Sequence, residues 1–164
     1  MNEDKKIAIV PGSFDPITFG HLNIIKRAAI DHDKVYLAVM INPNKSYMFT
    51  ISQRERIAKV AVTGMDKVEV ISSEGMLWEL ARDLGAVSIV KGYRNETDLA
   101  YENDMAEYNS TRYPQAKTLL YKADEALCDI SSTLVREKIR DGEALEGVLP
   151  EKVIKEINKI IDEQ

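Results

Sequence analysis

The sequence predicts an α/β protein with a doubly wound, five-stranded parallel sheet and helices on both faces. Short apolar runs alternate five times with segments of helical character, and runs of this length are typical of buried parallel strands. Such alternation favours one parallel sheet covered by helices. The 164 residues suffice for one substantial core, and no repeat, low-complexity tract or linker-like stretch divides them. We therefore expect residues 1–164 to form a single domain.

Five apolar runs are the predicted strands. Turn-forming residues or a helical segment follow each run, as Pro11-Gly12 follow the first and Asn42-Pro43-Asn44 the second. In chain order the strands are expected over 7–10, 35–41, 68–71, 87–90 and 118–121.

Helical segments lie between and after these strands. In the first, Leu22, Ile25 and Ala29 recur with the spacing of one helix face. In the second, Ser52 is placed to cap the helix while Glu55 reaches back to the Ser52 backbone. The fourth has a thin apolar face. In order, the helices are expected over 19–30, 52–63, 74–84, 97–110 and 132–140, and from Pro150 onward.

Composition and charge exclude several classes of protein. The 27 acidic and 22 basic residues give a net charge of −5, whereas a general nucleic-acid binder shows a basic excess. No apolar run approaches the roughly 18 to 20 residues that span a bilayer, and the short run after residues 1–6 predicts no signal peptide. The single cysteine, Cys128, cannot form an internal disulfide, which fits a reducing compartment. We expect a cytoplasmic protein that binds neither nucleic acid nor membrane.

The loops beyond the carboxyl ends of the strands are the candidate ligand site, because folds of this class bind ligands where the strand order reverses. In the first of these loops Gly12 allows a sharp turn, and Ser13 offers its hydroxyl and its N–H to a phosphate. The helix that follows presents its N-terminal N–H groups to the same anion. Gly20 is unfavourable within a helix, which suggests a close ligand approach that would bring a phosphate to His21. These residues are about equally compatible with a structural role, in which His21 is half-buried and Gly20 serves packing, and with phosphate binding.

The distal loop offers a second helix N-terminus. Either Ser131 or Ser132 can cap the helix that starts near residue 132, which leaves hydroxyl and N–H groups for another anion. Arg136 lies one turn further on, where a solvated surface charge is the usual outcome, and His32 is assigned to the surface. No spacing of His, Cys, Asp or Glu describes a metal cage. Cys128 has no histidine placed to activate it, so we expect a partly buried thiol and not a nucleophile.

Together these residues resemble the nucleotidyltransferases that carry a (T/H)xGH signature. The resemblance rests on Gly12-Ser13-Phe14-Asp15-Pro16, on Thr18-Phe19-Gly20-His21 and on Ile130-Ser131-Ser132-Thr133. More narrowly, nearly the whole chain is similar to bacterial phosphopantetheine adenylyltransferases, because segments 42–45, 48–50 and 91–94 match as well, as do Asp98, Tyr101 and Glu102. The resemblance implies a Rossmann-like nucleotidyltransferase fold.

The implied reaction transfers the adenylyl group of ATP to 4'-phosphopantetheine and gives dephospho-coenzyme A and pyrophosphate. The attacking phosphate is already an anion, so in-line displacement requires no general base, and catalysis would rest on positioning and charge neutralisation. The resemblance further implies Mg²⁺ carried with the ATP phosphates, a homohexamer, and feedback binding of coenzyme A.

The resemblance also implies roles for individual residues. His21 would donate to the α-phosphate as the catalytic residue, Arg94 would hold the triphosphate, and Glu102 would meet the ribose or orient cations. Lys91 stands where relatives usually have arginine, and Leu77 is about equally well explained as a core leucine. Leu127-Cys128-Asp129 replace a frequent aromatic, so backbone groups and apolar contact would hold adenine. The substrate-binding set is Ser13, Lys45, Leu77 and Lys91; the ATP-binding set is Ser13, Phe14, His21, Gly92, Tyr93, Arg94, Glu102, Leu127, Cys128, Asp129, Ile130, Ser131, Ser132 and Thr133.

Three other functions stay open at this point. A sister adenylyl- or cytidylyltransferase would act on a mononucleotide or a sugar-alcohol phosphate, but Lys45 and segment 91–102 argue against it. A non-catalytic adenine-nucleotide sensor would keep the phosphate loop, but it would not need His21. A flavodoxin-like interaction domain leaves Gly20-His21 without a purpose.

Overall fold

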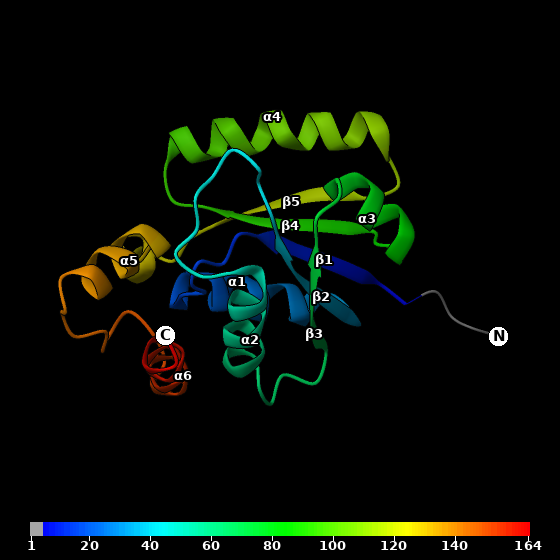
Figure 1. Ribbon diagram of the computed structural model, residues 1–164. Helices are drawn as coiled ribbons and strands as arrows, with labels where there is room; N and C mark the ends of the chain where they lie inside the picture. The colour runs from blue at the N-terminus through cyan, green and yellow to red at the C-terminus, as the bar shows by residue number, and fades with distance from the viewer. Residues whose placement is uncertain (1–4) are drawn as a thin grey trace.

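Five parallel strands form one sheet in the order β3-β2-β1-β4-β5 in the computed structural model, which describes residues 5–164 (Figure 1). The predicted α/β class with a doubly wound parallel sheet is therefore confirmed. Residues 1–4, which belong to the segment expected to hold no signal peptide, lie outside the described residues. The strands are β1 (Ile7–Gly12), β2 (Lys34–Met40), β3 (Val68–Ser73), β4 (Ser88–Tyr93) and β5 (Lys117–Lys122).

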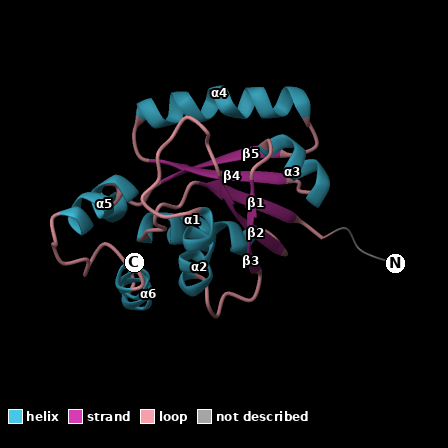
Figure 2. Cartoon of the chain, in the orientation of Figure 1, coloured by secondary structure: helices cyan, strands magenta, loops and turns pink. Residues whose placement is uncertain are grey.

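The helices connect and follow these strands, and they lie on both sides of the sheet (Figure 2). No helix within residues 5–164 is long and apolar enough to cross a membrane. That the whole chain forms one domain stays a prediction. The helices are α1 (Phe19–Asp31), α2 (Ile51–Ala61), α3 (Leu77–Leu84), α4 (Glu96–Arg112), α5 (Ser132–Arg140) and α6 (Glu151–Asp162), with a short 3₁₀ turn at Glu125–Leu127.

The two faces of the sheet carry cores of unequal size. Along β1, Ala8 and Val10 face the larger core, whereas Ile9 faces the smaller one. Helices α1, α2, α5 and α6 contribute buried residues to the larger core, and α3 contributes Ala81 to the smaller. Because both faces are covered, the central strands β1 and β2 are almost wholly apolar and buried, as expected for parallel strands between two helical layers, whereas the edge strands β3 and β5 carry more polar residues.

Strand β4 extends further than the apolar run 87–90 predicts. Lys91, Gly92 and Tyr93 continue the strand by pairing with Leu120, Tyr121 and Lys122 of β5. These three residues stay in the sheet because their backbone pairs with β5, and such pairing cannot be predicted from the hydropathy of the sequence. Residues 91–93, expected in a loop, therefore form the carboxyl end of a strand.

The predicted cap of α2 is wrong by two residues. Thr50, and not Ser52, is the N-cap, because its hydroxyl accepts from the Gln53 N–H (3.1 Å) while the Gln53 side chain accepts from the Thr50 N–H (3.0 Å). Both the observed pair, Thr50 and Gln53, and the predicted pair, Ser52 and Glu55, fit the capping-box pattern. The start of α3 is also later than predicted, at Leu77, because the Gly75 N–H bonds to the Ser73 hydroxyl in a turn instead of entering the helix.

His32 is buried, which corrects its assignment to the surface. His32 is the C-cap residue of α1. Its ring Nδ1 donates to the Ala28 carbonyl (2.8 Å), and its Nε2 lies 2.8 Å from the Ser88 hydroxyl. The two neighbouring aspartates are exposed and suggested a surface turn. The imidazole instead satisfies a helix-end carbonyl and joins α1 to β4, which is a structural role.

Candidate active site

A cavity of about 630 Å³ opens at the carboxyl ends of β1 and β4, where the strand order reverses. Its wall includes residues from four segments that follow predicted strands, 11–21, 42–50, 91–94 and 122–133. Of the predicted site residues, those that line it are Ser13, Phe14, His21, Lys45, Lys91, Gly92, Tyr93, Arg94, Glu102, Leu127, Ile130, Ser131, Ser132 and Thr133. Leu77, Cys128 and Asp129 are not among its lining residues.

The first loop differs in detail from the expected glycine turn. The left-handed residue is Phe14 (φ 48°), a conformation that bulky side chains rarely adopt and that often marks functional sites. Gly12 is favoured for another reason, since a Cβ there would lie 3.1 Å from the Phe14 ring, which is closer than most such contacts. At Gly20 a Cβ would meet the protein only at ordinary distances of 3.5 Å or more, so any close approach at this position must come from a ligand.

His21 is held by the start of its own helix. The Thr18 hydroxyl accepts from the His21 N–H (3.5 Å), and His21 Nδ1 accepts from the Thr18 N–H (3.0 Å), which forms a reciprocal cap. Because Nδ1 is the acceptor, the ring proton of the neutral form resides on Nε2. The Phe14 ring packs edge-on against the imidazole at 4.9 Å. The ring is therefore fixed in orientation, and Nε2–H has no partner within residues 5–164.

The surroundings of His21 keep it neutral. Burial of the imidazole, followed by the positive charges of Lys91 and Arg94, lowers its pKa from 6.5 to about 4. At neutral pH the side chain is therefore a hydrogen-bond donor without a net charge, beside two cations.

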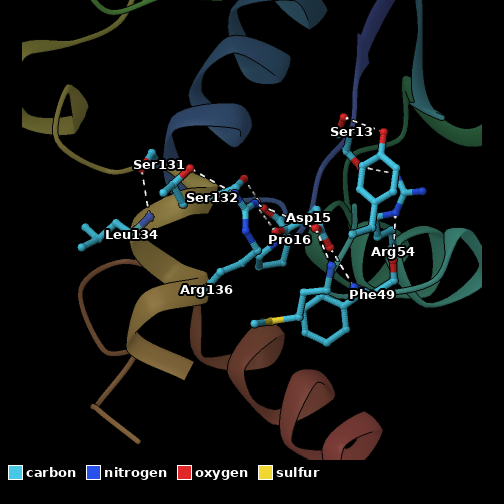
Figure 3. A network of polar contacts seen from close by, with 12 residues as sticks. Ser13, Asp15, Pro16, Phe49, Arg54, Ser131, Ser132, Leu134 and Arg136 are labelled. Carbon is cyan, nitrogen blue, oxygen red and sulfur yellow. Dashed lines mark hydrogen bonds and ion pairs between the residues drawn. The ribbon is translucent and has the colours of Figure 1, made fainter. Parts of the chain in front are cut away.

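The second helix N-terminus is joined directly to the first loop (Figure 3). Ser131 caps α5 by accepting from the Leu134 N–H (3.1 Å), and the Ser132 hydroxyl donates to the Pro16 carbonyl (2.8 Å). The second of these contacts connects residues that are 116 positions apart in the chain. The N-termini of α1 and α5 consequently contribute to the wall of the same cavity.

Arg136 is not the solvated charge expected from its position. It donates to the Asp15 carbonyl (2.9 Å) and to the Thr133 hydroxyl (3.0 Å), and its side chain is only 25% exposed. The Asp15 carboxylate lies 3.9 Å away and supplies the opposite charge. Arg136 therefore reinforces the junction between the two helix N-termini.

Two ion pairs lie on the opposite wall. Lys91 of β4 lies 3.6 Å from Glu102 of α4, and burial raises the pKa of that carboxyl although Lys91 opposes the rise. Arg94 pairs with Asp98 at 3.2 Å. Within residues 5–164, no three His, Cys, Asp or Glu side chains form a group that could hold a metal ion. This wall therefore offers two cations, Lys91 and Arg94, to a ligand. A ligand with more negative charge than a carboxylate could replace Glu102 and Asp98 as their partners.

The remaining predicted residues have distinct surroundings. Lys45 is exposed on the segment after β2 and lines the cavity. Leu77 packs against the smaller core, on the other face of the sheet from the larger one. The Cys128 thiol is half-buried as expected, 3.4 Å from the Asp124 carbonyl, and makes no contact with a histidine among the described residues.

Three further residues shape the site and were not singled out from the sequence. Asp15 is buried and bonds to the backbone of Met48 and Phe49, and Arg54 is buried against the first loop. Tyr47 lies 3.4 Å from the Ser13 hydroxyl. Asp15 was visible only as a member of a motif, and Arg54 resembles the other basic residues of its helix. Their partners are distant in sequence, so no local pattern could reveal them.

A nucleotidyltransferase is the class of protein that this fold and its paired helix N-termini define. The Cytidylyltransferase-like family matches residues 9–138. Phosphopantetheine adenylyltransferases are among the similar proteins: one from Streptococcus gordonii is 41% identical over 94% of each chain, and one from Streptococcus sanguinis is 39% identical over 97% of this chain and 98% of its own. One from Limosilactobacillus reuteri is 37% identical over 97% of this chain and 92% of its own. The chain therefore belongs to the Cytidylyltransferase-like family and, within it, to the phosphopantetheine adenylyltransferases.

Proposed function

We propose that this chain transfers the adenylyl group of ATP to 4'-phosphopantetheine and forms dephospho-coenzyme A and pyrophosphate. The observation that carries the proposal is the shared cavity, whose wall includes two helix N-termini and the neutral His21 ring. Helix N-termini bind phosphate through free N–H groups and the positive end of the helix dipole. The names of the relatives supply the acceptor, since the three described above are phosphopantetheine adenylyltransferases.

The reaction is a single in-line displacement at the α-phosphorus. An oxygen of the acceptor phosphate forms a bond to this phosphorus while the bond to the oxygen bridging the α- and β-phosphates breaks, and pyrophosphate leaves with that electron pair. The nucleophile needs no deprotonation, which agrees with a site in which the one histidine is a hydrogen-bond donor. The His21 Nε2–H would bond to a non-bridging α-phosphate oxygen and stabilise its charge in the transition state.

The acceptor and the nucleotide would occupy different parts of the cavity. Ser13, Lys45 and Lys91 would bind the acceptor phosphate, the first through its hydroxyl and the others as point charges. Arg94 would leave Asp98 to hold the triphosphate, and the α5 N-terminus at Ser131–Thr133 would hold its far end. Leu127 and Ile130 provide apolar contact for adenine.

Mg²⁺ would enter with ATP as part of the substrate. Among residues 5–164, three carboxylate residues line the cavity: Asp98 and Glu102 are each paired with a cation, and the Asp15 carboxylate accepts from the N–H groups of Met48 and Phe49. Mg²⁺ keeps most of its water when phosphates bind it. This donor set fits an ion carried by the triphosphate better than an ion resident in the protein.

Location and assembly belong to the same proposal. A single half-buried cysteine fits the reducing cytoplasm. The exposed Tyr101 and Met105 of α4 are suitable for contact with other copies of the chain in a homohexamer. Coenzyme A would act as a feedback ligand by competing with the substrates for the cavity. Light scattering would give a mass of six chains, and a monomer mass would refute the hexamer.

Pyrophosphate release tests the proposed function. With ATP and 4'-phosphopantetheine we expect release of pyrophosphate together with dephospho-coenzyme A, and no turnover when nicotinate mononucleotide replaces the acceptor. Turnover only with the mononucleotide would show a sister nucleotidyltransferase. Tight ATP binding without pyrophosphate from either acceptor would show a sensor.

A further inference from the structure

A buried arginine lies directly behind the cavity. Arg54 of α2 is 1% exposed, and its three hydrogen bonds within the described residues all go to backbone carbonyls. Nη1 donates to Ser13 (2.7 Å) and Met40 (3.0 Å), and Nε donates to Phe49 (3.2 Å). The Tyr47 ring covers the guanidinium at 4.0 Å. Figure 3 shows Arg54 between the loop of Ser13 and the segment of Phe49.

The burial of this charge requires an explanation, because a buried cation is unfavourable unless hydrogen bonds compensate it. Arg56, two residues further along the same helix, is 40% exposed and pairs with the side chains of Glu156 and Glu163. The three carbonyls bound by Arg54 come from three separate segments, at the ends of β1 and β2 and just before α2. A planar guanidinium can hold three such acceptors in fixed directions, which an ammonium group cannot.

Asp15 holds the same segment from the other side. Its carboxylate, 3% exposed, accepts from the N–H groups of Met48 and Phe49, both at 2.9 Å. Phe49 is thus bound at its N–H by a buried anion and at its carbonyl by a buried cation. Segment 42–48, which carries Lys45, is anchored at the two ends where Arg54 bonds to Met40 and to Phe49.

The Tyr47 hydroxyl adds a third connection between these segments. It accepts from the Asn42 N–H at 2.7 Å and lies 3.4 Å from the Ser13 hydroxyl. Lys45 itself is exposed and makes no ion pair within residues 5–164. Its position relative to Ser13 is therefore set by these anchors and not by contacts of its own side chain.

We propose that Arg54 is a positioning residue that sets where Lys45 stands relative to Ser13, and so aligns the acceptor phosphate. This inference rests on the proposed function, which assigns Ser13 and Lys45 to that phosphate. Arg54 does not line the cavity, so it would act without contacting a substrate bound there. It acts through the backbone of the two segments that carry the binding groups, where small displacements have large effects on rate.

Arg54→Lys tests the proposal because it keeps the positive charge but loses the planar guanidinium that donates to the three carbonyls. We expect kcat/KM for 4'-phosphopantetheine to fall by about ten- to a hundredfold, since misplacement of about 1 Å costs up to about 10². The Kd of a non-hydrolysable ATP analogue should stay within about twofold, because in the described part of the chain Arg54 makes no hydrogen bond to the N-termini of α1 and α5 or to Arg94, which are proposed to hold the nucleotide. Arg56→Lys is the matched control and should change neither quantity. Equal losses for nucleotide and acceptor, or no loss for the acceptor, would overturn the proposal.

A double-mutant cycle with Lys45→Ala separates positioning from general structural support. If Arg54 acts through Lys45, then Arg54→Lys should lower acceptor kcat/KM by less than about twofold in the Lys45→Ala background, because coupled residues are non-additive. Additive losses would contradict the proposal. Wild-type turnover is measured first, so an inactive wild type refutes the proposed function, whereas an active wild type with an additive cycle refutes only this inference.

Tyr47→Phe keeps the inference testable if Arg54→Lys does not fold. This change keeps the ring over the guanidinium but removes the hydroxyl that binds the Asn42 N–H. We expect KM for 4'-phosphopantetheine to rise by about three- to tenfold, as expected for loss of a hydrogen bond of about 1 kcal/mol, with the ATP-analogue Kd unchanged. An unchanged KM would show that the anchors do not set the acceptor site.

Discussion

At the level of single residues, the environment of His21 determines what its side chain can do. Its Nδ1 accepts from the Thr18 N–H, so the ring cannot take up a proton there without losing the helix cap. Lys91 and Arg94 disfavour the imidazolium further. The result is a fixed Nε2–H donor, which suits a reaction that develops negative charge on an α-phosphate.

Replacement of His21 tests this role. We expect His21→Ala to lower kcat by on the order of 10²–10³, with a much smaller change in ATP affinity, because the lost contact acts mainly in the transition state. Steady-state kinetics and calorimetric titration with a non-hydrolysable ATP analogue measure the two quantities. A kcat equal to that of the wild type would remove His21 from the mechanism.

Titration of the His21 ring provides a second check. NMR of the histidine Cε1–H signals should show this ring unprotonated down to about pH 4. The folded-state pKa lies below the unfolded value of 6.5, so the unfolded chain binds the proton first as pH falls. The folding free energy should therefore weaken from about pH 6.5 toward pH 4, and His21→Ala should lack this component. Protonation near pH 6.5 in the folded protein would contradict the neutral-donor account.

Replacement of Lys45 should weaken binding of the acceptor and leave binding of ATP unaffected. Lys45→Ala should raise KM for 4'-phosphopantetheine by about tenfold or more, since a charge-assisted contact to phosphate contributes about 1.5–3 kcal/mol. The Kd for ATP should be nearly unchanged. A defect confined to ATP binding would place Lys45 on the nucleotide side of the cavity.

At the level of elements, the start of α2 shows how local patterns can compete. Thr50-Gln53 and Ser52-Glu55 both satisfy the capping-box rule, and the structure selects the first pair. The reason is tertiary, because Asp15 binds the N–H groups of Met48 and Phe49 and the helix begins two residues later.

Matched substitutions distinguish the two candidate caps. Thr50→Ala should lower the free energy of unfolding by about 0.5–2 kcal/mol, the usual effect of losing an N-cap. Ser52→Ala, at an exposed position, should change it by less than about 0.5 kcal/mol. Urea denaturation measures both, and a larger loss for Ser52→Ala would mean that the cap is assigned to the wrong residue.

At the level of the whole molecule, the sequence was sufficient for the fold and for the location of the cavity. Apolar runs alternating with helical segments define the parallel sheet, and the reversal of strand order then fixes which loops meet. What it could not predict depends on distant partners: His32 bonds to Ser88, Arg136 to Asp15, and Arg54 to Ser13. A local pattern contains no information on such pairs. His32 and Arg136 were expected at the surface, but His32 is buried and Arg136 is half-buried.

The central claim is that both helix N-termini bind one ATP molecule with its α-phosphate at His21. A crystal structure with an ATP analogue that carries a carbon bridge between the α- and β-phosphates tests it most directly. We predict His21 Nε2 within about 3 Å of an α-phosphate oxygen, the usual hydrogen-bond distance, with Ser131–Thr133 on the same triphosphate. An α-phosphate out of reach of the imidazole, or a triphosphate that contacts only one of the two helices, would contradict the account.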